Sequence, residues 1–143
     1  MVIFEPFYEF FEKSFGIFDN NFSMVFQTFF INGGYNSIGL LLLIIPLIFL
    51  SLFYFIWRYP YGTIWHWLIS LSIIAIIVAA STFGSVSLSL AKFLVDPNPL
   101  IADFTGSLVW KYAILNGFLA IGISFIFSLI LRRYSKVQMH LPF

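Results

Sequence analysis

The chain has 143 residues, of which 61% are hydrophobic and only 9% are charged, a composition outside the range of soluble globular proteins. Its formal net charge is +1 and its seven basic residues form no patch, which argues against nucleic-acid binding. Cysteine is absent, so disulfides, thiolate metal sites and cysteine catalysis are excluded. The sequence therefore predicts an integral membrane protein in contact with the lipid bilayer.

The first 35 residues are expected to form an interfacial segment outside the cytoplasm. Residues 2–18 predict an amphipathic helix, because six aromatic rings fall in one arc of about 100° and three glutamates fall in the opposite arc. Anionic leaflets repel an acidic face, so we expect the rings to face the membrane and the glutamates to face water or a basic surface on a partner protein. The side chains assigned to this partner-facing helix include Glu5, Glu9, Glu12, Phe7 and Phe11.

A second aromatic stretch, residues 22–31, is too short to cross a bilayer and ends at an Asn-Gly-Gly break. We expect it to lie at the interface or to pack back on the helices that follow.

Residues 36–131 predict a bundle of three transmembrane helices. The apolar stretches at 36–57, 64–91 and 108–131 each exceed the roughly 20 residues needed to cross a bilayer. The second stretch would be about 42 Å long as one helix, so we expect it to tilt, to project from the membrane or to unwind near 83–89. The predicted fold class is thus an all-α integral membrane protein with three transmembrane helices after an N-terminal amphipathic helix.

Small residues mark helix-docking faces on two of the spans. The second span is small on two faces, one with Ala75 and Ala79 and the other with Ala80 and Gly84, which is typical of a helix between two neighbours. The third span carries small and polar residues in one arc of about 120°, so it also predicts a docking face, with its asparagine hydrogen-bonding across the contact. The pattern leaves open whether this face meets the second span or another subunit. Its residues are Ala113, Asn116, Gly117, Ala120, Ser124 and Ser128.

Charged residues divide between the two sides of the predicted bundle. All six acidic residues precede the first span or lie between the second and third, whereas Arg58, Arg132, Arg133 and Lys136 lie in the other loop or after the third span. Lys and Arg near the ends of spans favour the cytoplasmic side. We therefore expect the N-terminus outside and a short basic tail, residues 132–143, in the cytoplasm, in a bacterial inner membrane or an organellar inner membrane.

No set of residues predicts a reaction. No Ser-His-Asp set, carboxylate pair or phosphate-binding glycine loop can be assembled, and no substrate is evident, so we do not expect an enzyme. His66 is the single histidine near a span and has no second axial ligand at a similar depth, so we expect no haem, metal or other cofactor.

Three functions are compatible with this pattern. The leading hypothesis is a non-catalytic subunit that anchors or scaffolds a larger membrane complex, such as a secretion, injection or respiratory machine, with other membrane subunits as partners. The alternative is a homo-oligomeric pore, since the predicted topology resembles that of one class of phage holins. Such a pore would need a polar stripe in contact with water, formed by Asn116, Ser124 and Ser128. The third hypothesis is a haem-carrying redox anchor, because the number of helices resembles that of the three-helix membrane anchors of some respiratory dehydrogenases. Against it, the sequence has no second axial ligand to pair with His66.

Overall fold

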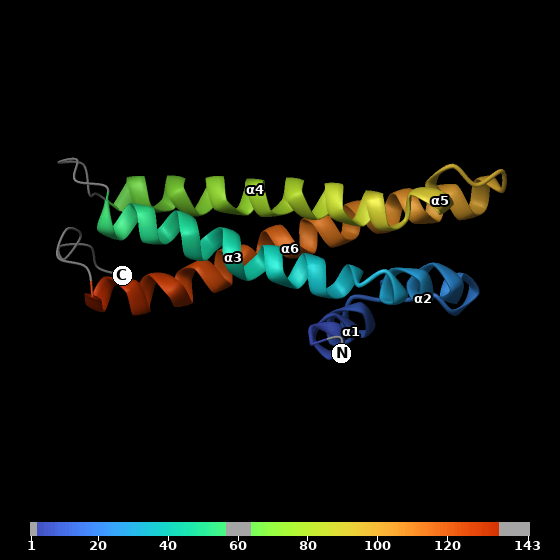
Figure 1. Ribbon diagram of the computed structural model, residues 1–143, viewed down its shortest axis with the longest axis horizontal. Helices are drawn as coiled ribbons and strands as arrows, with labels where there is room; N and C mark the ends of the chain where they lie inside the picture. Colours follow the sequence, from blue (N-terminus) through green and yellow to red (C-terminus); the bar gives the residue numbers. More distant parts are fainter. Residues whose placement is uncertain (1–2, 57–63, 135–143) are drawn as a thin grey trace.

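The computed structural model describes residues 3–56 and 64–134, and these residues are almost entirely helical (Figure 1). Three long apolar helices follow a short N-terminal helix, which confirms the predicted fold class. The predicted loop at 58–63 and the tail beyond 134 lie outside the described residues. In chain order the elements are α1 (Glu5–Ser14), the 3₁₀ helix η1 (Asn20–Phe22), α2 (Ser23–Ile31), α3 (Gly34–Phe55), α4 (Ile64–Ser89), α5 (Ala91–Leu94) and α6 (Pro99–Tyr134).

The three long helices are each long and apolar enough to cross a membrane, as expected of an integral membrane protein. α4 runs unbroken to Ser89, so the chain does not unwind at 83–89. α6 has 36 residues and is about 54 Å long, starting nine residues before the predicted span. Its early start has a local cause: Pro99 supplies a favoured first residue, and the Asn98 side chain accepts a hydrogen bond from the Leu100 amide at 3.1 Å.

α4 and α6 approach each other closely at Gly117. A Cβ at Gly117 would stand 3.3 Å from the Cβ of Ala79 and 3.5 Å from the backbone oxygen of Ala75. Small residues on both helices allow this contact, because a larger side chain on either would hold the backbones apart. The docking face of α6 therefore meets α4 of its own chain.

The short helices gather beside the start of α3, where α2 leads into it and α1 lies against it (Figure 1). Gly33 makes the turn between α2 and α3 with a φ of +68°, a conformation that glycine adopts without steric cost. The ring of Phe4 lies over Gly39, where an added Cβ would be 2.3 Å from the ring. A glycine in the second turn of α3 is thus what lets the N-terminal residues pack directly on the bundle.

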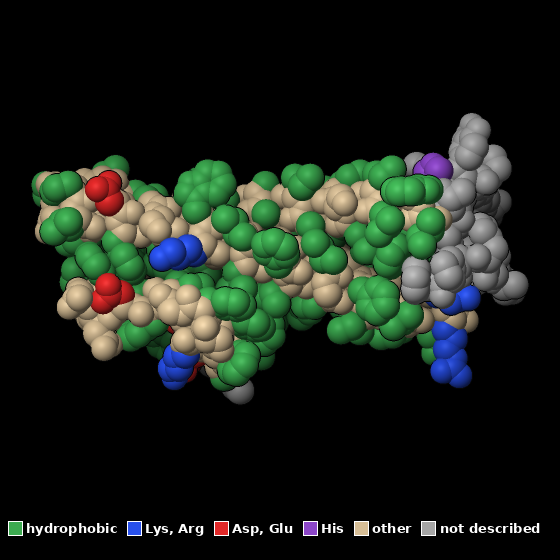
Figure 2. All heavy atoms as spheres, turned by 180° about the vertical axis from the view of Figure 1, so that it is seen from behind, with side chains coloured by type: hydrophobic (Ala, Val, Ile, Leu, Met, Phe, Trp, Pro, Cys, Tyr) green, Lys and Arg blue, Asp and Glu red, His purple; other side chains and the backbone are tan. Residues whose placement is uncertain are grey.

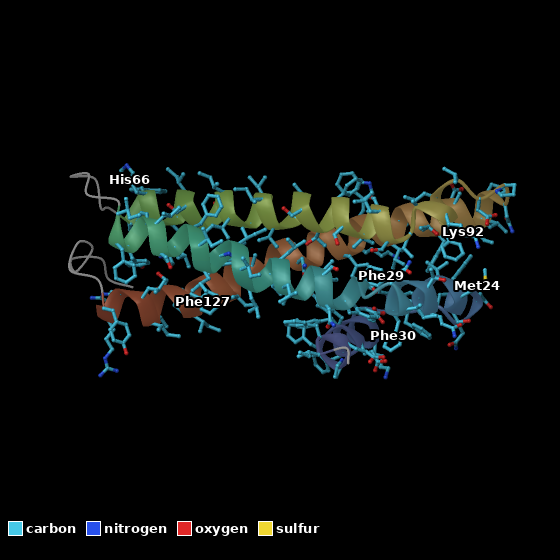
Figure 3. The ribbon with its side chains drawn as sticks, in the orientation of Figure 1. Met24, Phe29, Phe30, His66, Lys92 and Phe127 are labelled. Carbon is cyan, nitrogen blue, oxygen red and sulfur yellow. The ribbon has the colours of Figure 1, made fainter. Side chains whose placement is uncertain are left out.

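Charged side chains lie toward the two ends of the molecule. In Figure 2 the middle of the visible face is covered by hydrophobic side chains, with acidic residues toward one end and arginine and histidine at the other. His66 and Lys92 lie near opposite ends of the bundle (Figure 3). Since hydrocarbon excludes charge, this distribution agrees with a bundle that crosses a bilayer.

Candidate polar core and the cleft beside it

α1 directs two side chains into the bundle. Tyr8 is fully buried and Glu12 is only 3% exposed, and their four-residue spacing places both on one side of the helix. The expectation that Glu12 faces water or a partner is wrong, because α1 turns the boundary between its aromatic and acidic arcs toward the bundle. Phe7 is exposed, and Phe11 is half-buried.

The Glu12 carboxyl is held by two tyrosines from different helices. The Tyr35 hydroxyl of α3 donates to Glu12 Oε1 at 2.7 Å, and the Tyr112 hydroxyl of α6 donates to the same oxygen. Burial raises the pKa of the Glu12 carboxyl above its ordinary value, and the tyrosine hydrogen bonds oppose this shift without cancelling it. Ionisation of Glu12 is therefore less favourable where α1 is docked than it is in water.

Asn116, near the middle of α6, joins four helices. Its Oδ1 accepts a hydrogen bond from the Tyr8 hydroxyl at 2.7 Å. Its Nδ2 donates to Thr82 Oγ1 of α4 at 2.9 Å and to the backbone oxygen of Ile38 in α3 at 3.1 Å. An amide offers two donors and one acceptor oxygen, so this side chain has a partner at both of its polar atoms.

A second polar contact lies toward the other end of the bundle. Trp67 Nε1 donates to Ser128 Oγ at 2.7 Å, and the Tyr54 hydroxyl shares a hydrogen bond with the same oxygen. One turn away, Ser124 is fully buried and its Oγ has no hydrogen-bond partner among the described residues.

All six residues of the predicted α6 face are buried between the helices of one chain. Ala75 and Ala79, predicted as the matching face of α4, are half-buried against it. The face residues are Ala113, Asn116, Gly117, Ala120, Ser124 and Ser128.

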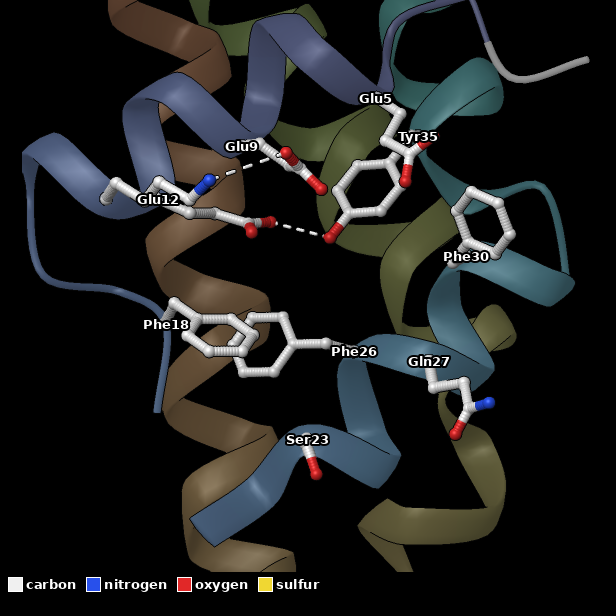
Figure 4. Close-up of a pocket in the computed structure, with 10 residues that line it drawn as sticks. Glu5, Glu9, Glu12, Phe18, Ser23, Phe26, Gln27, Phe30 and Tyr35 are labelled. Atoms are coloured by element: carbon white, nitrogen blue, oxygen red, sulfur yellow. Dashed lines mark hydrogen bonds and ion pairs between the residues drawn. The ribbon is translucent and has the colours of Figure 1, made fainter. Parts of the chain in front are cut away.

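A cleft of about 490 Å³ opens between α1 and α2 (Figure 4). The three glutamates of α1 line one side, where Lys13 forms an ion pair with Glu9 at 3.7 Å. Four aromatic rings and two polar side chains of the opposite wall complete the lining: Phe18, Phe26, Phe30, Tyr35, Ser23 and Gln27. Sequence reasoning missed this cleft, because it forms only when α1 packs on α3 and α2 folds back beside it.

Within the described residues, no three His, Asp or Glu side chains are grouped so that they could hold a metal ion. His66 lies half-buried at the start of α4. Comparison with protein-family models, with curated proteins and with solved structures gives no match for this chain.

The docking of α1 should depend on pH through Glu12. A raised pKa in the folded state means that the stabilisation is fully present below the ordinary value of 4.5 and is lost as pH rises through the higher folded pKa. We expect the melting temperature of the protein in detergent to fall over this range relative to Glu12→Gln, which keeps an acceptor oxygen and cannot ionise. Glu9 and Lys13 are present in both proteins, so the difference isolates Glu12. A wild-type protein that gains stability over Glu12→Gln as pH rises would contradict this assignment.

Proposed function

We propose that this chain is a non-catalytic subunit that anchors or scaffolds a larger membrane complex. The observation that carries the proposal is a face of small residues on α4 that its own chain leaves uncovered. Ala80 is exposed, and Ser87, about two turns further along the same side of α4, is half-buried. A Cβ added at Gly84 would meet nothing within 4 Å. This face lies opposite the side of α4 that packs on α3 and α6, and small residues are what a second transmembrane helix needs for close approach.

Exposed aromatic surface on α1 and on Phe15, the residue that follows it, supports the same proposal. Phe10 and Phe15 are 64% and 66% exposed, and Phe7 is 40% exposed. Rings on the outside of a short docked helix need lipid or a neighbouring protein to cover them. The partners we propose are therefore other membrane subunits, in contact with α4 and with the outer side of α1.

The buried polar groups favour a structural role over a pore or an active site. The pore alternative needs Asn116, Ser124 and Ser128 to line a wet path between copies, and all three are fully buried inside one chain. Asn116 and Ser128 are also engaged by partners on neighbouring helices. The pore therefore loses the side chains on which it depended, and we propose no catalytic role for these groups.

The proposed setting is a bacterial inner membrane or an organellar inner membrane, with the N-terminus outside and the C-terminus in the cytoplasm. Arg132 and Arg133 lie in the last turn of α6, whereas the acidic residues lie toward the other end of the molecule (Figure 2). The rule that basic residues stay in the cytoplasm supports this orientation.

Gly84→Leu tests the proposal. We expect this variant to shrink the particle that is extracted from the native membrane in mild detergent, because a leucine would fill the groove that the partner helix occupies. The measurement is particle mass together with the identity of co-purifying chains.

Gly122→Leu is the matched control, since a Cβ at Gly122 of α6 also meets nothing within 4 Å, and it lies on another helix. We expect its particle to match the wild type. A wild-type protein that is extracted alone as a monomer, or two variants with the same particle mass as wild type, would sink the proposal.

A further inference from the structure

The cleft between α1 and α2 has one acidic wall and one aromatic wall. Glu5, Glu9 and Glu12 face it from α1, and Lys13 is the one basic side chain in its lining. Phe18 and Phe26 pack against each other on the other wall, with ring centroids 4.8 Å apart, as Figure 4 shows. Three carboxyl groups against one ammonium leave the cleft with an acidic excess.

The carboxyl of Glu12 supplies a second and independent observation. Both tyrosine hydroxyls donate to Oε1, so Oε2 accepts no hydrogen bond from the described residues, although the side chain is only 3% exposed. In Figure 4 this carboxyl points into the space between α1 and the aromatic rings. Glu12 belongs to the lining of the cleft, so this oxygen is available to a hydrogen-bond donor that enters the cleft.

We propose that this cleft binds an organic cation, namely an ammonium or guanidinium group carried on an apolar body. The cationic head would donate to Glu12 Oε2 and be attracted by Glu5, while the apolar body lies on the rings of Phe18 and Phe26. Aromatic faces also attract cations directly. A volume of about 490 Å³ falls within the range of small-molecule sites, and the acidic wall repels anions.

Binding is coupled to the proton of Glu12. A cation beside the carboxyl favours the ionised form, so the arriving head group displaces a proton, which leaves to solvent. Glu5, Glu9 and Lys13 of α1 line the same cleft, and the charges of Glu9 and Lys13 act on this carboxyl. The Tyr35 and Tyr112 hydroxyls donate to it from α3 and α6. Affinity should therefore rise with pH as Glu12 ionises. This inference stands apart from the proposed role as a subunit.

The test is calorimetric titration of the whole protein in a maltoside detergent with phenethylammonium chloride. The neutral analogue 2-phenylethanol has nearly the same shape and no charge. We expect saturable binding of the ammonium, stronger at pH 8 than at pH 5, and binding of the alcohol at least about tenfold weaker, the size expected for a hydrogen bond to a charged group.

Glu12→Gln should weaken binding of the ammonium about tenfold and remove its pH dependence. Asp103→Asn is the matched control, since it removes one acidic charge on the exposed surface of α6, outside the cleft, and we expect it to bind as the wild type does. Equal affinities for the ammonium and the alcohol, no saturable binding of the ammonium, or equal losses in the two variants would overturn the proposal. The comparison of the two ligands holds even if Glu12→Gln does not fold.

The cation could be a soluble amine or the amine of a lipid headgroup, and competition separates the two. Micelles supplemented with phosphatidylethanolamine are compared with micelles supplemented with diacylglycerol, which has no amine. Weaker binding of phenethylammonium in the first supports the cleft and assigns the lipid amine as the source. Equal binding in both supports the cleft and assigns a soluble amine.

Discussion

Gly117→Leu should destabilise the bundle by forcing apart the contact between α4 and α6. The new side chain would start 3.3 Å from the Cβ of Ala79 and 3.5 Å from the backbone oxygen of Ala75, so α6 and α4 must move apart to admit it. Overpacking of this kind costs about 1–3 kcal/mol and sometimes more. We expect a lower melting temperature in detergent and unfolding at a lower fraction of added SDS.

Two matched glycines define the controls for this variant. Gly84→Leu and Gly122→Leu add the same side chain where nothing lies within 4 Å, so both should unfold like the wild type. Gly117→Ala should fall between, because its single methyl needs a shift of only a few tenths of an ångström. If Gly117→Leu unfolds together with these controls, the close contact of α4 and α6 is not the one described.

Asn116→Leu should loosen α1 from the rest of the molecule. The change leaves the hydroxyls of Tyr8 and Thr82 buried without the partner that each has in the wild type. Each unpaired buried group costs about 1–3 kcal/mol. Because the chain has no cysteine, a single cysteine at Ile17, which is 7% exposed, reports the docking. We expect maleimide to label Ile17→Cys faster when Asn116→Leu is present.

Tyr8→Phe provides the test of the pairwise contact. It removes the hydroxyl that Asn116 accepts from, so the loss of stability in the double variant should be smaller than the sum of the two single losses. A strictly additive result would mean that the two side chains do not share a hydrogen bond. A labelling rate unchanged by Asn116→Leu would mean that this amide does not hold α1.

The long helices could be predicted from the sequence because their signal is local. Runs of apolar residues longer than the thickness of a bilayer identify a span without knowledge of its neighbours. The start of α6 was harder to predict, because residues 99–107 are too polar to be counted in a span. The helix nevertheless begins there, at Pro99 and with the side chain of Asn98 as its cap. Capping signals at that point of the sequence would have found the true start.

The polar core could not be predicted because it depends on which helices meet. A glutamate among aromatic residues is normally placed on the water side of an amphipathic helix, and Glu12 sits at the edge of the acidic arc, only about 40° from Tyr8. Its burial is decided by two tyrosine hydroxyls, one in α3 and one in α6. Composition and periodicity carry no information about such distant partners. The small-residue face of α6 could be predicted, because its residues recur with the helical period within a single segment of the sequence. The helix on which that face packs could not be predicted.

The contacts of α1 also fix the order in which the protein can be assembled during synthesis. Tyr8 is hydrogen-bonded to a residue 108 positions later in the chain, and Glu12 to one 100 positions later. At about 5–20 residues per second, the ribosome needs roughly 5–20 s to reach those partners. The segment that is made first must therefore wait for the last span to be inserted, and its docking marks a chain whose three spans are all in place.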